Sequence, residues 1–295
     1  MRLFTGSACA LITPFTREGT LDTVALDALV RWQVARGTDA LVVCGTTGEA
    51  STMTEAEQEE AVRTAVEAAD GRVPVIAGVG GNDTAKVRAA CKRVASLGAD
   101  GALAVTPYYN KTTQQGLIAH YQSVADASPV PVIAYNVPGR TGLNLLPQTA
   151  VRLAEHENFA GLKEASGDMR QTMEVIRLCP ESFPIYSGCD ELTLPVLCCG
   201  GAGVISVAAN VVPAAMHALC ASFLQGDLQD ARKKQEALAP LINALFARVN
   251  PIPVKAAAAL LGICQNVVRL PLVPMEEPAA LEELAAHLAP LREVI

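Results

Sequence analysis

Short runs of β-branched and other apolar residues alternate along this chain with longer segments in which apolar residues recur at helical spacing. The apolar runs recur about every 20 to 35 residues, which is typical of repeated βα units. Eight of them are predicted strands: Ser7–Ile12, Asp39–Val43, Val75–Gly78, Gly101–Val105, Val132–Asn136, Ala160–Lys163, Pro184–Ser187 and Gly203–Ser206. Predicted helices between them include Asp22–Arg36, Thr54–Ala69, Thr84–Leu97, Thr113–Ala127, Pro147–Glu155 and Met169–Cys179.

The near-continuous apolar character of these strands predicts a parallel sheet that is covered on both faces. Eight such units favour an α/β fold, a closed (β/α)8 TIM barrel, with a doubly wound open sheet as the alternative. No GxGxxG opens the first unit, and the run Gly78–Gly81 lacks the acidic residue of a dinucleotide site. We therefore expect no nicotinamide cofactor.

The strand pattern stops after Gly226, and the rest of the chain is predicted to be helical. We expect a catalytic barrel over residues 1–226 and a small C-terminal helical domain over 227–295. Its predicted helices are Leu228–Arg248, Pro253–Leu261 and Pro278–Leu291. Segments rich in Ala and Leu are more often packing surfaces or subunit contacts than sites.

Composition narrows the range of partners. The formal net charge is −7, and no block of Lys or Arg stands out, which argues against nucleic acid or an anionic membrane as a partner. No apolar run reaches the roughly 20 residues of a membrane-spanning helix, and the first residues do not resemble a secretion signal. The nine cysteines include no CxxC pair and are expected to be reduced. We expect a soluble, cytoplasmic protein.

Metal chemistry is not expected either. The chain has 4 histidines, and none shows the i, i+4 spacing of a metal-binding helix. The prediction is that no metal site is present.

Candidate chemistry gathers where the predicted strands end, which is where active sites lie in such barrels. Lys163 follows an apolar run, and low-dielectric surroundings would favour its neutral amine, the form that attacks carbonyls. A lysine that reaches solvent or pairs with Glu164 is the alternative. Tyr135 ends the neighbouring strand and could exchange protons with that amine, although a rim tyrosine that packs its ring is the alternative.

Anion-binding groups follow two of the same strands. Thr46 and Thr47 lie in a turn that could bind an anion through hydroxyls and backbone N–H groups, or could simply begin a helix. Arg140 lies in a loop framed by Pro and Gly, where its guanidinium could bind a carboxylate with two hydrogen bonds, or could be solvated. Tyr108 and Tyr109 follow the fourth strand, where an aromatic subunit contact is the alternative. Convergence of such groups on one cavity favours a catalytic site.

The whole chain resembles the dihydrodipicolinate synthase family of pyruvate-dependent class I aldolases. The resemblance is carried, in order, by Gly45–Glu49, Tyr135–Gly142, Gly161–Glu164, Gly203–Val207 and Asn250–Lys255. It implies a barrel with C-terminal helices, usually assembled as a homotetramer of tight dimers. It implies no cofactor other than the covalent Schiff base that pyruvate forms with Lys163.

The resemblance also implies roles for single residues. Tyr135 would donate the proton, Thr46 would link it to Tyr109 in a relay, and Tyr109 would cross the tight dimer interface. Thr47 and the backbone of Ile205 would bind pyruvate, and Gly188 would be a further substrate-binding residue. Arg140 would bind the carboxylate of aspartate semialdehyde.

The implied reaction is condensation of pyruvate with L-aspartate 4-semialdehyde to 4-hydroxy-tetrahydrodipicolinate, toward diaminopimelate and lysine. Related lyases and dehydratases share the lysine and tyrosine, so another aldolase or dehydratase acting on a 2-keto-3-deoxy sugar acid is the alternative. Thr46 and Arg140 favour the synthase, since sialic acid lyases typically have Ser at the first position and lack the arginine. A catalytically idle barrel that binds a small acid is disfavoured by the full set of reactive residues.

Regulation is where the chain departs from the pattern. Family members inhibited by lysine typically carry histidines or acidic groups at the positions of Glu55, Gln58 and Lys86. Lys86 would repel a cationic effector. Ala50, Ser51 and Tyr108 would leave part of a pocket. We expect weak or absent lysine inhibition.

Overall fold

Eight parallel strands close into a barrel in chain order, in a computed structural model that describes residues 2–294. The strands are β1 Gly6–Ala10, β2 Ala40–Val43, β3 Val75–Gly78, β4 Gly101–Val105, β5 Val132–Asn136, β6 Phe159–Glu164, β7 Ile185–Ser187 and β8 Gly203–Ser206. The predicted strands are confirmed, with end differences of one or two residues. Closure is completed by pairing of β1 with β8, so the open-sheet alternative is wrong.

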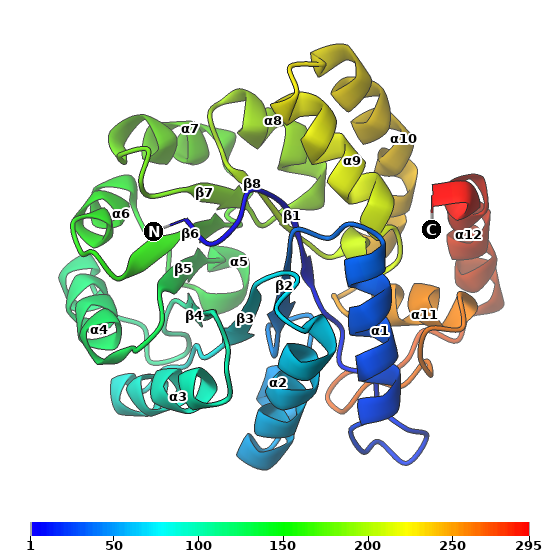
Figure 1. Ribbon diagram of the computed structural model, residues 1–295, viewed down its shortest axis with the longest axis horizontal. Coiled ribbons are helices and arrows are strands. Elements are labelled where there is room, and N and C mark those ends of the chain that lie inside the picture. The colour runs from blue at the N-terminus through cyan, green and yellow to red at the C-terminus, as the bar shows by residue number, and fades with distance from the viewer. Residues whose placement is uncertain (1, 295) are drawn as a thin grey trace.

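Helices surround the barrel, as Figure 1 shows. They are α1 Thr23–Ala35, α2 Glu55–Ala69, α3 Thr84–Ser96, α4 Gln114–Ala127, α5 Pro138–Thr141, α6 Pro147–Ala154, α7 Met169–Leu178, α8 Thr193–Cys198 and α9 Pro213–Leu224. The predicted start signals are confirmed: Thr54 and Glu57 form a capping box, and Pro147 occupies the first turn of α6.

Alternation along the strands divides the apolar residues into two cores. One core fills the barrel interior and contains small or narrow side chains such as Ala8, Val42 and Ile76 together with Tyr135. The other core lies between the barrel and the helices and contains the alternate strand residues, such as Cys9 and Leu41. Burial on both faces explains the near-continuous apolar strands of the sequence.

The C-terminal part of the chain is helical, as predicted. It contains α10 Leu228–Phe246, α11 Ile252–Leu260, α12 Pro278–Leu288 and the 3-10 segment Ala289–Val294. The last predicted helix therefore ends earlier than expected and continues as a tighter turn. In Figure 1 α11 and α12 lie to one side of the barrel, beyond α1 and α10. The division of the chain into domains at residues 226 and 227 remains a prediction.

Among the described residues, no helix has both the length and the apolar character needed to span a membrane.

Candidate active site

A cavity of about 490 Å³ opens at the carboxyl ends of the strands. It is lined from several strand ends, by Gly45 and Thr46 after β2, by Gly78–Asp83 after β3, and by Tyr135 and Arg140 from β5 and α5. This is the edge of the barrel at which the sequence predicted chemistry. The structure therefore brings three of the predicted site residues, Thr46, Tyr135 and Arg140, onto one cavity.

Lys163 is directed into the barrel by a bulge in β6. The register with β5 shifts so that Val132 pairs with Phe159 but Ile133 pairs with Gly161. The extra residue reverses the alternation beyond it, so Leu162 packs in the outer core. Lys163 faces inward beside its strand partner Tyr135.

Glycine is required at the bulge. Gly161 has φ +128°, and a Cβ atom there would lie 2.3 Å from the carbonyl oxygen of Pro184. Sequence analysis selected Lys163 as the candidate, but no pattern in the sequence predicted the bulge that turns its side chain into the barrel.

Burial shifts the Lys163 amine toward its neutral form, the form that attacks carbonyl groups. Only 6% of the residue is exposed, and its Nζ atom lies 4.5 Å from the centre of the Tyr135 ring. Burial lowers the pKa of Lys163 to about 8, because the charged form loses hydration. Asp190 opposes that shift, whereas the positive charge of Arg140 adds to it. The alternative in which Lys163 pairs with Glu164 is wrong, because the two side chains occupy opposite faces of β6 and Glu164 binds Asn136 and Ser166 instead.

Glu164 has a structural role behind the site. Its carboxylate accepts hydrogen bonds from Asn136 Nδ2 at 2.9 Å and from the Ser166 backbone N–H at 2.6 Å. Asn136 is the strand partner of Glu164, just as Tyr135 is the partner of Lys163. The bond therefore fixes the register of the strand ends that carry the two reactive side chains. Sequence reasoning missed this pair, since an outward-facing Asn and Glu have no distinctive spacing.

Tyr135 keeps its proton throughout the physiological range. Burial raises the pKa of the phenol to about 12, although Arg140 and a hydrogen bond with the Thr46 side chain oppose that shift. The phenol is thus protonated, its ring lies against the Lys163 amine, and its hydroxyl bonds to the Thr46 side chain. This arrangement suits transfer of a proton between a reacting group and the cavity.

The two threonines of the turn after β2 face different environments. Thr46 is exposed to the cavity, where it meets Tyr135. Thr47 is buried, and its hydroxyl oxygen accepts a hydrogen bond from Asn250 Nδ2 at 2.9 Å. The sequence predicted that both would bind an anion, and the structure assigns them separate neighbours.

Arg140 is a cation at the rim of the cavity. It lies in α5, which the sequence interpreted as a loop, and one guanidinium nitrogen donates to the carbonyl of Asn250 at 3.2 Å. The rest of the guanidinium is available to a ligand, since the residue is exposed. Such a planar group binds carboxylates with two parallel hydrogen bonds.

Tyr109 is the one predicted catalytic residue that this chain directs away from the others. Its side chain is 90% exposed, and its φ of 65° is a left-handed backbone conformation. It lines a second, open depression with Tyr108, Lys111 and Arg140. A predicted relay from Tyr135 through Thr46 to Tyr109 is not formed within a single chain.

Gly188 follows β7, and Ile205 lies in β8. A Cβ atom on Gly188 would approach Lys163 Cε to 3.1 Å, so a glycine leaves space beside the amine. Ile205 is fully buried in the barrel interior on β8. Its side chain therefore contributes packing, and only its backbone is left for a ligand.

Asp190 is a buried carboxyl group that the sequence did not identify, and burial raises its pKa. It lies just after β7, and its Oδ2 atom accepts backbone hydrogen bonds from Val207 at 3.0 Å and Ala208 at 2.9 Å. It thereby ties the ends of β7 and β8 together, and its negative charge raises the pKa of Lys163 against the effect of burial. The sequence did not predict these contacts, because Asp190 is a single acidic residue in a turn and belongs to no recognisable motif.

The residues expected to form an effector pocket line the same cavity as Tyr135. Ala50, Ser51, Glu55, Gln58, Lys86 and Tyr108 are all among them. Arg93 is a further cation in this lining, and it pairs with Glu55 and Glu59. The structure therefore brings the expected residues together beside the proposed reaction site.

Comparisons with known proteins agree with this geometry. Residues 3–289 match the dihydrodipicolinate synthetase family. The 4-hydroxy-tetrahydrodipicolinate synthase of Thermoanaerobacter sp. (strain X514) is 49% identical over 278 residues, which cover 94% of this chain and 93% of that protein.

Solved structures of dihydrodipicolinate synthases are also similar to this chain. A dihydrodipicolinate synthase variant described as monomeric has a TM-score of 0.96 at 44% identity, with 99% of this chain and 98% of that chain covered. The chloride-inhibited dihydrodipicolinate synthase from Acinetobacter baumannii, complexed with pyruvate, has a TM-score of 0.95 at 42% identity, with 99% of each chain covered. With its barrel, its buried lysine and a match that spans nearly its whole length, the chain belongs to the dihydrodipicolinate synthetase family.

Proposed function

We propose that this protein is a lyase that condenses pyruvate with L-aspartate 4-semialdehyde to give 4-hydroxy-tetrahydrodipicolinate, in the pathway to diaminopimelate and lysine. One observation carries the chemistry: Lys163 is buried without a carboxylate partner, has a pKa of about 8, and lies 4.5 Å from the ring of Tyr135. The relatives described above carry the synthase name.

The reaction begins when the neutral Lys163 amine attacks the ketone carbon of pyruvate. Water leaves, with Tyr135 supplying the proton to the departing oxygen, and a protonated Schiff base remains. The positive imine withdraws electrons from the methyl group, so loss of one methyl proton gives an enamine. No oxidation or reduction occurs in these steps.

The enamine carbon then adds to the aldehyde carbon of the second substrate, forming the new carbon–carbon bond. The aldehyde oxygen takes up a proton and becomes the hydroxyl of the product. The free amino group of the semialdehyde attacks the imine carbon, closes the ring and displaces Lys163, which regenerates the enzyme. Tyr135 and Thr46 are the groups placed to move these protons.

Each substrate has its own proposed binding groups. Thr47, Gly188 and the backbone of Ile205 bind pyruvate next to the lysine, and Arg140 binds the carboxylate of the semialdehyde. The separation of Arg140, at the cavity rim, from the buried lysine matches a second substrate that enters after the first has reacted.

The active assembly is proposed to be a homotetramer of tight dimers. Tyr109 supports this, because its exposed ring turns away from the cavity of its own chain and could reach the site of a second copy. Mass measurement in solution tests the assembly. A monomer that is fully active, and that does not respond to Tyr109→Phe, would contradict the relay across an interface.

The proposed location is the cytoplasm. All nine cysteines are free thiols in the structure, which fits a reducing compartment.

The function is tested by steady-state pyruvate consumption with three aldehydes: aspartate semialdehyde, N-acetylmannosamine and glyceraldehyde. We expect a strong preference for the semialdehyde in the wild type. Arg140→Ala should raise the KM for the semialdehyde about 10- to 100-fold, since it removes a charge-assisted pair, and should leave the KM for pyruvate nearly unchanged. Preference for a sugar aldehyde would instead assign the protein to sugar-acid lyases.

A further inference from the structure

The turn that carries Thr46 and Thr47 is held in place by residues far away in the sequence. Asn250 Nδ2 donates to Thr47 Oγ1 at 2.9 Å, and both residues are buried. On the other side of the turn, the Thr13 hydroxyl donates to the Gly48 carbonyl at 2.6 Å. Neither contact is made by the barrel strand that leads into the turn, so the C-terminal part of the chain takes part in shaping the site.

A buried ion pair joins α11, the helix that follows Asn250, to the same turn. Lys255, in α11 five residues beyond Asn250, contacts the Glu49 carboxylate with its Nζ atom at 2.5 Å, and both side chains are at most 2% exposed. Lys255 also donates to the Val267 carbonyl at 2.7 Å and lies over the Phe15 ring. Such a pair is strong where water is absent and its geometry is good. It joins α11 to the end of the same turn.

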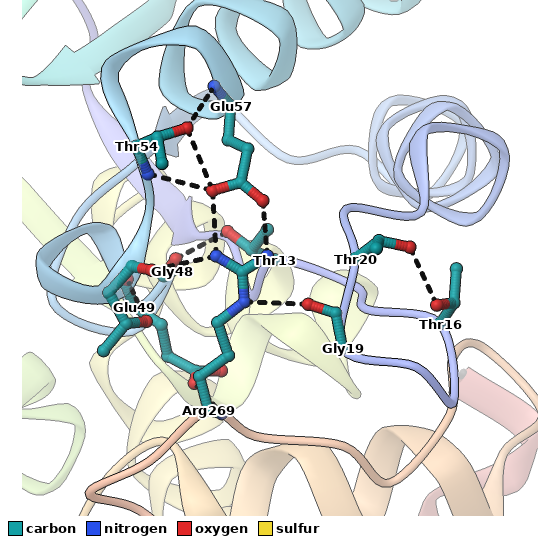
Figure 2. Close-up of polar contacts among 10 residues, drawn as sticks. Thr13, Thr16, Gly19, Thr20, Gly48, Glu49, Thr54, Glu57 and Arg269 are labelled. Carbon is teal, nitrogen blue, oxygen red and sulfur yellow. Dashed lines mark hydrogen bonds and ion pairs between the residues drawn. The ribbon is translucent and has the colours of Figure 1, made fainter.

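Arg269 forms a second, outer attachment, drawn in Figure 2. Its guanidinium donates to the carbonyls of Gly19 and Thr52 and pairs with the Glu57 carboxylate. The backbone N–H of Arg269 donates to Glu49 at 2.9 Å. The side chain of Arg269 therefore joins the C-terminal segment to the loop before α1 and to α2, and its hydrogen bonds and ion pair do not include Thr46 or Thr47.

Asn250 also contacts the other proposed substrate-binding residue. Its main-chain carbonyl accepts the hydrogen bond from Arg140 at 3.2 Å, while its side chain binds Thr47. One buried residue thus bridges a group proposed for pyruvate and a group proposed for the semialdehyde.

We propose that Asn250 is a positioning residue, whose amide orients the Thr47 hydroxyl toward the carboxylate of pyruvate and whose main-chain carbonyl holds the Arg140 guanidinium. The inference rests on the function proposed above for Thr47. It assigns the C-terminal helices a part in substrate binding, whereas the sequence suggested only packing or a subunit contact.

The hydrogen bond sets the direction of the Thr47 proton. A hydroxyl has one proton to donate and two lone pairs. Because the Asn250 amide N–H occupies one lone pair, the Thr47 proton cannot point at Asn250 and is free to be donated to another acceptor. A carboxylate is an acceptor only, so the orientation imposed by Asn250 suits pyruvate.

The decisive variant is Asn250→Asp, which keeps the shape of the side chain and replaces the donor with an acceptor. The Thr47 hydroxyl should turn toward the new carboxylate, and the added negative charge should repel pyruvate. We expect the KM for pyruvate to rise at least about tenfold, while kcat changes less than about threefold. The KM for the semialdehyde should change less than about twofold, because the main-chain carbonyl that holds Arg140 remains.

Two further variants separate positioning from stability. Asn250→Ala removes the amide without adding charge and should raise the pyruvate KM about threefold to tenfold. Arg269→Met breaks an ion pair of the same C-terminal segment and should lower Tm while leaving the pyruvate KM unchanged. If Arg269→Met raises the pyruvate KM as much as Asn250→Ala does, general loosening explains the effect and the proposal is wrong.

Thr47→Val distinguishes failure of this inference from failure of the proposed function. If Thr47→Val raises the pyruvate KM but both Asn250 variants leave it unchanged, Thr47 binds pyruvate without help and only the positioning role is overturned. If Thr47→Val leaves the pyruvate KM unchanged, the proposed role of Thr47 and the inference built on it both fail.

Discussion

Two buried lysines in this chain have opposite surroundings. Lys163 and Lys255 are 6% and 0% exposed, and each lies against an aromatic ring, at 4.5 Å for Tyr135 and 4.0 Å for Phe15. Lys255 contacts a carboxylate and a carbonyl, whereas Lys163 contacts no carboxylate. Burial lowers the pKa of both, but only for Lys255 does a carboxylate in direct contact oppose the shift.

The difference shows how one residue type serves two purposes in one fold. A buried ammonium that is paired on several sides remains charged and joins segments, and it is costly to remove. A buried amine without a partner sheds its proton easily and can attack a carbonyl. The number of contacting acceptors, rather than the extent of burial, separates a structural lysine from a nucleophile here.

The largest expected effect is the loss of catalysis when the nucleophile is replaced. Lys163→Arg keeps a cation of similar length but cannot form a Schiff base, so kcat should fall at least about 10³-fold. Steady-state pyruvate consumption measures this loss. Lys92→Arg, an exposed position on α3, is the control and should retain wild-type rates. Residual turnover of Lys163→Arg near the wild-type rate would remove the lysine from the mechanism.

The comparison predicts opposite effects on stability. Lys255→Met leaves the Glu49 carboxylate buried without its cation and should lower the free energy of unfolding by about 3–5 kcal/mol. Lys163→Met removes a group whose charged form is poorly hydrated, so stability should stay the same or rise. Urea denaturation of both variants gives the two values. Equal destabilisation by the two substitutions would contradict the distinction between Lys255 as a structural residue and Lys163 as an unpaired one.

The pH dependence of the first step follows from the lowered pKa of Lys163. Only the neutral amine attacks, so kcat/KM for pyruvate should increase about tenfold per pH unit below pH 8 and level off above it.

The stability of the fold also depends on this pKa, because the unfolded chain holds the Lys163 proton up to a higher pH than the folded chain does. This group therefore makes the folded state less favourable below about pH 8, and the penalty is relieved as pH rises from 8 toward the ordinary lysine value.

A pH profile of pyruvate imine formation, measured by stopped flow, tests this account. A rate that is flat from pH 6 to pH 9 would mean that the amine is already neutral, and the proposed balance between burial and Asp190 would be wrong.

The smallest expected effect concerns a third, exposed lysine. Lys86 lines the cavity beside Tyr135, and its positive charge opposes binding of a cationic amino acid. Added lysine should therefore leave activity unchanged below millimolar concentration. Lys86→Glu reverses one charge and should increase lysine sensitivity by a few fold, about the strength of an exposed ion pair. Inhibition of the wild type by micromolar lysine would refute this expectation.

The fold could be predicted from the sequence because its signals are local. Each strand is an apolar run, and helices such as α2 and α6 carry their own start signals at Thr54 and Pro147. The site was predicted where residues follow strand ends, as for Lys163, Tyr135 and Thr46. Such positions converge as soon as the barrel closes.

The features that the sequence did not predict depend on pairing between segments that are distant in the chain. The bulge at Gly161 exists only relative to the register of β5, and Asn250 meets Thr47 across 203 positions of the chain. The role proposed for the exposed ring of Tyr109 depends on contact with a second copy of the chain. Neither composition nor spacing within one segment contains such information.

The central claim is that Lys163, the buried lysine without a carboxylate partner, is the group that reacts with pyruvate. Borohydride reduction in the presence of pyruvate, followed by peptide mass spectrometry, tests it directly. We expect a carboxyethyl adduct on the peptide with Lys163, no adduct on the peptide with Lys255, and no adduct at all in Lys163→Arg. An adduct on another lysine, or none in the wild type, would contradict the account.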